Sequence, residues 1–114
     1  MVKDRDLISG MLALQSDLIS ADHLDAIVAP TNGPAWVTNY ATGDAFTLGS
    51  SGPAAVAGYP DITVPAGFAG PLPLGVSFMA GKFSDAHLLA IASAFEQVTH
   101  ARRAPTFLPT SPTP

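Results

Sequence analysis

The groups from which a covalent hydrolase could be built are two adjacent serines and two lysines. Ser50 and Ser51 lie in a Gly-Ser-Ser-Gly run directly before a Pro-Ala-Ala run. This position favours an N-cap and turn role over a nucleophilic role, because serine caps helices and proline suits their first turn. Lys3 is terminal and Lys82 lies in a predicted turn, whereas a lysine that acts as a base must be desolvated or flanked. The sequence therefore predicts no complete serine–lysine triad in this chain.

Metal and thiol chemistry are also not predicted. The chain has no cysteine, and His23, His87 and His100 are scattered without HxxxH or HxxE spacing. His100 is interpreted as a partner of a helix dipole. Asp22 and Asp25 flank a predicted turn and are interpreted as solvated charges rather than as an acid–base pair. We expect no metal and no organic cofactor.

Residues 31–50 form a long segment with no helical or strand period. A connection of this length inside a compact domain is normally functional, disordered or covered by a partner. Its aromatic side chains, Trp36, Tyr40 and Phe46, either line a binding surface or hold the loop against the body. Asp44 either points toward a substrate pocket or stabilises a turn. These four residues are the predicted substrate-binding set.

Composition excludes several classes of function. Only 12% of the residues are charged, against about 25% in ordinary soluble domains, so much of the surface is expected to lie against polypeptide. The net charge of −4 and the single basic pair Arg102-Arg103 argue against nucleic acid as a partner. No apolar run approaches the roughly 18 residues that a membrane span needs. The cytoplasm is the default expectation, and an export signal in a missing front half stays open as an alternative.

The first half of the chain reads as a helix, a strand and one helical turn. Apolar residues at three- and four-residue spacing predict an amphipathic helix over 5–21. The apolar run 26–29 predicts a strand that is buried on both faces, as in a parallel or mixed sheet. Pro53 is expected to open a short helix that Gly58 caps. The strand 61–64 follows, closed by a Pro-Ala-Gly exit.

The second half predicts a strand, a helix and a tail. A Gly/Pro-rich loop over 66–73 leads to residues 74–79, whose period of two predicts a strand antiparallel to 61–64. Ser84 is a good N-cap for a helix over about 85–100. Its buried stripe is predicted to consist of Leu88, Ile91, Ala92, Phe95 and Val98. The arginines Arg102 and Arg103 are expected at its C-terminal end, and a proline-rich tail follows.

The order of four motifs resembles the C-terminal part of the amidase signature family. LDAIVAPT spans residues 24–31, AGYP spans 57–60 and leads into ITVPAG, and LPLGVSFM spans 72–79. The helix that carries FEQ and HARR is similar to the family's last helix. In detail these motifs resemble the bacterial peptide amidases most.

The resemblance implies an α/β fold of amidase-signature type, with short strands of a mixed sheet flanked by helices and incomplete on its own. It implies that residues 1–104 are the C-terminal portion of an amidase-like domain and that residues 105–114 are a proline-rich tail. Family members hydrolyse amide C–N bonds with a Ser-Ser-Lys triad located in their N-terminal half. The chain is then expected to be inactive alone, with residues 31–50 forming part of one wall of the substrate pocket.

Two interpretations of the chain remain open at this stage. In the first, its partner is the N-terminal portion of an amidase, and the complete enzyme acts on a small amide or a peptide amide. In the second, the chain is a non-catalytic module derived from the amidase fold, which binds itself or another chain through an uncovered apolar face. The long aperiodic loop and the proline-rich tail favour the first.

Overall fold

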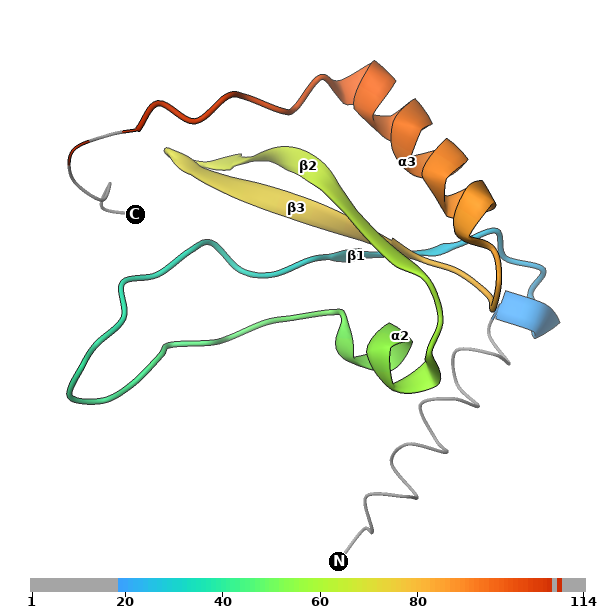
Figure 1. Ribbon diagram of the computed structural model, residues 1–114, viewed down its shortest axis with the longest axis horizontal. Coiled ribbons are helices and arrows are strands. Elements are labelled where there is room, and N and C mark those ends of the chain that lie inside the picture. Colours follow the sequence, from blue (N-terminus) through green and yellow to red (C-terminus); the bar gives the residue numbers. More distant parts are fainter. Residues whose placement is uncertain (1–18, 108, 110–114) are drawn as a thin grey trace, which may run out of the picture.

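The fold is an antiparallel sheet with one long helix packed on it (Figure 1). A computed structural model describes residues 19–107 and residue 109. Its elements in chain order are β1 (Ile27–Pro30), α2 (Gly52–Ala57), β2 (Asp61–Ala69), β3 (Leu72–Met79) and α3 (Asp85–Thr99). The helix predicted over 5–21 lies outside the described residues except for its last turn, where residues 19–21 are helical. Lys3 and most of the predicted tail also lie outside them.

The sheet has the order β1-β3-β2, so that β3 lies at its centre. Both pairings are antiparallel, which confirms the expected hairpin of β2 and β3. A tight turn at Gly70-Pro71 joins these two strands, and Gly70 adopts a positive φ of 58° that favours glycine. The partial α/β architecture is as predicted, whereas the strands described here include no parallel pair of the expected mixed sheet.

The prediction for the end of β2 was wrong. Pro65 and Gly67 do not close the strand, which runs on to Ala69 through a register shift between them. A proline is tolerated because β2 lies at the edge of the described sheet, where its missing N–H removes no ladder bond to a second neighbour. Gly67 supplies the flexible backbone that such a bulge needs. The predicted loop over 66–73 is therefore mostly strand.

The prediction that the first strand is buried on both faces was also wrong. Burial alternates along β1, and Val28 remains 58% exposed. The reason is the order of the sheet, because β1 is the edge strand opposite β2 and α3 packs on β2 and β3. An apolar run at an edge thus has one face without a cover from the described chain.

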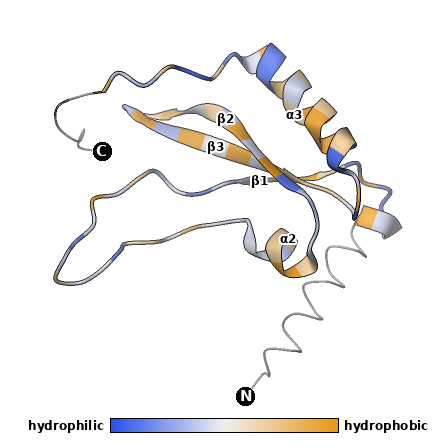
Figure 2. Cartoon of the chain, in the orientation of Figure 1, coloured by the Kyte–Doolittle hydropathy of each residue, from blue (hydrophilic) through white to orange (hydrophobic). Residues whose placement is uncertain are grey.

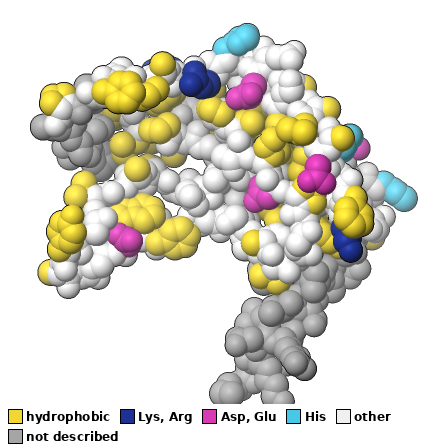
Figure 3. Space-filling model, viewed as in Figure 1, with side chains coloured by type: hydrophobic (Ala, Val, Ile, Leu, Met, Phe, Trp, Pro, Cys, Tyr) yellow, Lys and Arg dark blue, Asp and Glu magenta, His cyan; other side chains and the backbone are white. Residues whose placement is uncertain are grey.

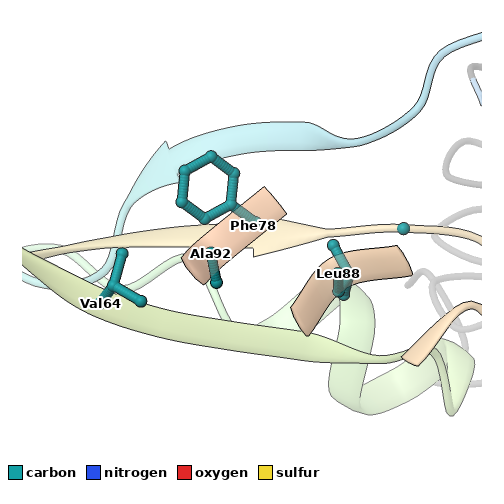
Figure 4. Close-up of a cluster of buried hydrophobic side chains, with 5 residues drawn as sticks. Val64, Phe78, Leu88 and Ala92 are labelled. Carbon is teal, nitrogen blue, oxygen red and sulfur yellow. The ribbon is translucent and has the colours of Figure 1, made fainter. Parts of the chain in front are cut away.

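The hydrophobic core lies between α3 and one face of the sheet (Figure 4). Phe78 contacts Phe95 edge-to-face, with ring centroids 5.5 Å apart. The buried members of this cluster are Val64, Phe78, Ala80, Leu88 and Ala92. Apolar segments recur along β2, β3 and α3, where these elements pack together (Figure 2). Four residues of the predicted helical stripe belong to this core, but Val98 is 82% exposed and does not.

The helices begin and end close to the predicted residues, but the predicted capping contacts are not all formed. Gly58 caps α2 with a left-handed φ of 67°, and Pro53 lies in its first turn, as predicted. Ser84 occupies the N-cap position of α3, but its hydroxyl donates to the Gly81 carbonyl at 2.6 Å instead of accepting from the helix. The helix ends at Thr99 with no basic residue in its last turn. Arg102 and Arg103, which were expected at the C-terminal end of this helix, therefore lie beyond its last turn.

Candidate functional site

An open groove of about 670 Å³ lies between the loop 31–50 and the strands β2 and β3. Figure 3 shows a hollow beside the loop 31–50, with apolar side chains along its edge. The groove is lined by Thr31, Asn32, Gly33, Ala35, Trp36, Thr38, Asp44, Thr63, Val64, Pro65, Pro73, Leu74 and Gly75. It therefore joins a wall from the loop to a floor from the sheet.

The loop leaves the sheet after β1 and returns to α2 as an irregular hairpin (Figure 1). Two isolated bridges bring its arms together, one between Asn32 and Gly49 and one between Asn39 and Gly43. At the tip, the Asn39 side chain accepts hydrogen bonds from two backbone N–H groups, those of Ala41 and Thr42. These local bonds give an aperiodic sequence a defined path.

Asp44 is the polar centre of the loop wall. Its Oδ1 accepts a hydrogen bond from the Thr38 hydroxyl at 3.0 Å and another from Trp36 Nε1 at 3.4 Å. Trp36 in turn packs edge-to-face on Phe46, with ring centroids 6.0 Å apart. Asp44 thus links the two arms of the loop through side chains. The turn at the tip is stabilised by Asn39 and not by Asp44.

The four predicted substrate-binding residues occupy three different positions. Trp36 and Asp44 line the groove, and Phe46 does not line it but contacts the Trp36 ring edge-to-face. Tyr40 is fully exposed at the tip and lines no part of the groove. Substrate binding by these side chains stays a prediction.

The floor of the groove contains a cluster that the sequence did not reveal. Thr31, Thr63 and Ser77 form what we call the hydroxyl triangle, with one member on or next to each strand. Ser77 Oγ lies 2.9 Å from Thr63 Oγ1 and 3.0 Å from Thr31 Oγ1, and Thr31 donates to Thr63 at 3.3 Å. Ser77 is 1% exposed, so its hydroxyl is satisfied by protein rather than by water. Isolated hydroxyl residues on or next to three different strands give no sequence signal until the register is known.

The residues considered for covalent catalysis, Ser50, Ser51 and Lys82, make separate contacts and do not hydrogen-bond to one another. Ser51 is the N-cap residue of α2 without a side-chain bond, and Ser50 bonds the Thr31 carbonyl through its N–H at 3.1 Å. Lys82 lies in the predicted turn, with its Nζ 4.9 Å from the Phe83 ring centroid. Across residues 19–107, no serine is hydrogen-bonded to a lysine or a histidine. The turn role of the serine pair is consistent with these positions.

Asp25 is a solvated charge, as predicted, because its side chain is 84% exposed. Its Oδ1 also lies 3.3 Å from Nε2 of His87 on α3, a contact that the sequence did not predict. The pair is exposed, and its contribution to stability is small. The described part of the chain contains no cluster of three or more histidine, aspartate or glutamate side chains placed to hold a metal. It also contains no helix that is both long and apolar enough to cross a membrane.

Comparison with known proteins gives a consistent set of relatives. No protein-family model matches the chain. A probable amidase of Arabidopsis thaliana is 49% identical over 65 residues, which cover 54% of this chain and 13% of that protein. The peptide amidase PAM, solved with the competitive inhibitor chymostatin, superposes with a TM-score of 0.80 at 39% identity, covering 94% of this chain and 23% of that one.

The native peptide amidase of Stenotrophomonas maltophilia superposes with a TM-score of 0.73 at 38% identity. The aligned region covers 92% of this chain and 22% of that peptide amidase. The chain matches a C-terminal segment of the amidase signature family. It spans less than a quarter of the length of each of these relatives. The expected family and its partial fold are confirmed, and the likeness to bacterial peptide amidases is confirmed with them.

Proposed function

We propose that this chain is a non-catalytic C-terminal portion of an amide-hydrolysing enzyme and that its groove forms one wall of the substrate pocket. The observation that carries the proposal is the combination of an amidase-like segment, which spans about a fifth of its relatives, with a groove whose lining contains no serine, lysine or histidine. The groups that attack the carbonyl and hold the oxyanion then come from the remainder of the enzyme.

The shape of the groove supports this division of roles. It is open, so a second body of polypeptide is needed before it encloses most of a ligand, as binding pockets do. Its loop wall offers an aromatic surface at Trp36 and a carboxylate at Asp44. Such a wall can position a small amide or a peptide amide, while the reacting groups approach from the other side.

The test is ammonia release from a peptide amide. The chain is assayed alone, together with the separately expressed N-terminal portion of the Stenotrophomonas maltophilia peptide amidase, and with that portion assayed alone as a control. We expect turnover only in the mixture. Ser51→Ala should leave the turnover of the mixture unchanged, because Ser51 is assigned to the N-cap of α2. Turnover by the chain alone that Ser51→Ala abolishes would contradict the proposal.

Self-association is the second candidate, and exposed apolar side chains favour it. Val28 on the edge strand is 58% exposed, and Leu89 on α3 is 59% exposed. Exposed apolar groups of this kind are often covered by a partner. Light scattering separates the candidates, because a self-associating module forms a stable oligomer alone. A portion of an enzyme instead changes mass when the N-terminal portion is added.

A further inference from the structure

We propose that the hydroxyl triangle (Thr31, Thr63 and Ser77) is an acceptor site for the N–H groups of a neutral carboxamide. A hydroxyl group carries one proton to donate and two lone pairs to accept. Three hydroxyls therefore hold three donors and six acceptor positions. The three mutual contacts of the triangle, at 2.9, 3.0 and 3.3 Å, consume all three protons and three of the lone pairs.

The closed triangle has only acceptor capacity left for a ligand. A group that brings its own N–H can bond to it without breaking an internal contact. A carboxylate or an ester oxygen brings no proton, so it would have to displace one of the internal bonds. Because a buried polar group without a partner is costly, this difference discriminates between ligands.

The triangle is accessible from the groove through a gap at Gly75. Thr31, Thr63 and Gly75 all line the groove, whereas Ser77 lies buried behind them. A Cβ atom on Gly75 would lie 2.9 Å from Thr63 Cγ2 and 3.0 Å from Thr31 Oγ1. The absence of a side chain at this position thus leaves the two threonine side chains uncovered. Register supports the arrangement, because Thr63 pairs with Ser77 across β2 and β3.

This inference rests on the proposed function and names a chemical preference of the same groove. An amide-hydrolysing enzyme takes in a carboxamide, which has N–H donors, and releases a carboxylate, which has none. An acceptor-only floor favours the first over the second. The hydroxyl triangle would therefore retain the substrate and release the acid product.

The test is a titration of the isotopically labelled chain, alone and bound to its N-terminal complement, followed by NMR. The probes are propionamide, N,N-dimethylpropionamide, propionate and propylammonium. We expect propionamide to shift the signals of Thr31, Thr63 and Gly75, while the dimethyl amide and propionate shift them much less. Equal shifts from propionamide and its dimethyl derivative would overturn the proposal. Equal shifts from propylammonium would overturn the assignment to a neutral amide.

Three substitutions make the test independent of overall folding. Thr63→Val keeps the shape of the side chain and removes one hydroxyl, and it should raise the Kd for propionamide about threefold to tenfold, the effect of one neutral hydrogen bond. Thr63→Ser should restore binding. Thr99→Val, on the far end of α3, removes a hydroxyl that bonds the Phe95 carbonyl and should leave the Kd unchanged.

Ser77→Ala should change selectivity rather than only affinity. Without Ser77, Thr31 still donates to Thr63, and the proton of Thr63 becomes free to point into the groove. Binding of the dimethyl amide and of propionate should then strengthen relative to propionamide. An unchanged order of affinities would contradict the proton count on which the proposal depends. These results stand whether or not the mixture releases ammonia, so a failure of the inference is separable from a failure of the proposed function.

Discussion

The two faces of the sheet differ in how completely the described chain covers them. On one face, Val64 and Phe78 pack against Leu88 and Ala92 of α3, and all four are buried. On the other face, the neighbouring residues in sequence, Thr63 and Ser77, form hydroxyl contacts below an open groove. Because side chains alternate along a strand, single steps in sequence separate the two roles.

This difference shows where stability and recognition reside in the molecule. The part of the α3 face that the helix covers excludes water, whereas Val28, which pairs with Phe78 at the edge of the same face, stays 58% exposed. The hydroxyl face satisfies its own protons but leaves acceptor positions and an aromatic wall open to the groove. A part of an enzyme that must fold and also contact substrate can divide these tasks between opposite faces of one sheet.

The largest expected effect is on the α3 face. Leu88→Ala removes a side chain that is 2% exposed and should lower the free energy of unfolding by about 2–5 kcal/mol, because the surrounding core collapses only partly into the cavity. Urea unfolding followed by circular dichroism measures this loss. The matched control is Leu89→Ala on the exposed side of the same helix, where we expect a change within about 0.5 kcal/mol. Equal losses at both positions would show that α3 does not pack as described.

The next effect is on the hydroxyl face. Gly75→Ala places a methyl group 2.9 Å from Thr63 Cγ2, closer than carbon atoms normally approach, and should cost about 1–3 kcal/mol through overpacking. Gly81→Ala is the control, because its nearest non-neighbouring atom lies 3.8 Å away. Unfolding midpoints of the two variants give the comparison. If Gly75→Ala is as stable as Gly81→Ala, the hydroxyl face is looser than the distances indicate.

The same contrast explains how much of the fold the sequence could predict. The helix α3 and the β2–β3 hairpin were predicted because periodicity and turn residues are local signals, strong at Leu88 and at Gly70-Pro71. The end of β2 was misjudged because the tolerance of Pro65 depends on the place of the strand in the sheet. The exposure of Val28 likewise follows from the sheet order, which no local pattern carries.

The site divides in the same way. Composition alone drew attention to the aromatic loop, and Trp36 and Asp44 do line the groove. The hydroxyl triangle was missed because Thr31, Thr63 and Ser77 meet only through strand pairing across tens of residues. The residues next to Ser77 in the sequence do not predict that its side chain is buried. Hydrogen bonds between distant strands follow from the register, and the register follows from the whole sheet.

A smaller effect is expected in the loop wall. Asp44→Ala removes the acceptor shared by Thr38 and Trp36 and should destabilise the loop by about 1 kcal/mol, the value of an ordinary hydrogen bond. Trp36 is the only tryptophan in the chain, so its fluorescence reports the loop directly. We expect a shifted emission maximum in Asp44→Ala and a largely restored spectrum in Asp44→Asn, which keeps one carbonyl acceptor. An unchanged spectrum in Asp44→Ala would show that Asp44 does not position the indole.

The smallest effect is expected at a contact that belongs to neither face. After α3, the guanidinium of Arg103 lies over the Phe68 ring, 4.5 Å from its centroid, and so ties the end of the chain to β2. Arg103→Ala should cost about 0.5–1 kcal/mol, because an exposed cation–π contact is weak.

The measurement is the NMR shift of the Arg103 side-chain protons, which the ring current of Phe68 should move upfield. Phe68→Leu should remove that upfield shift, and Arg102→Ala should leave it in place. If Arg103→Ala instead destabilised the chain as much as Leu88→Ala, the division of stability between the two faces would be wrong. The segment after α3 would then be part of the core.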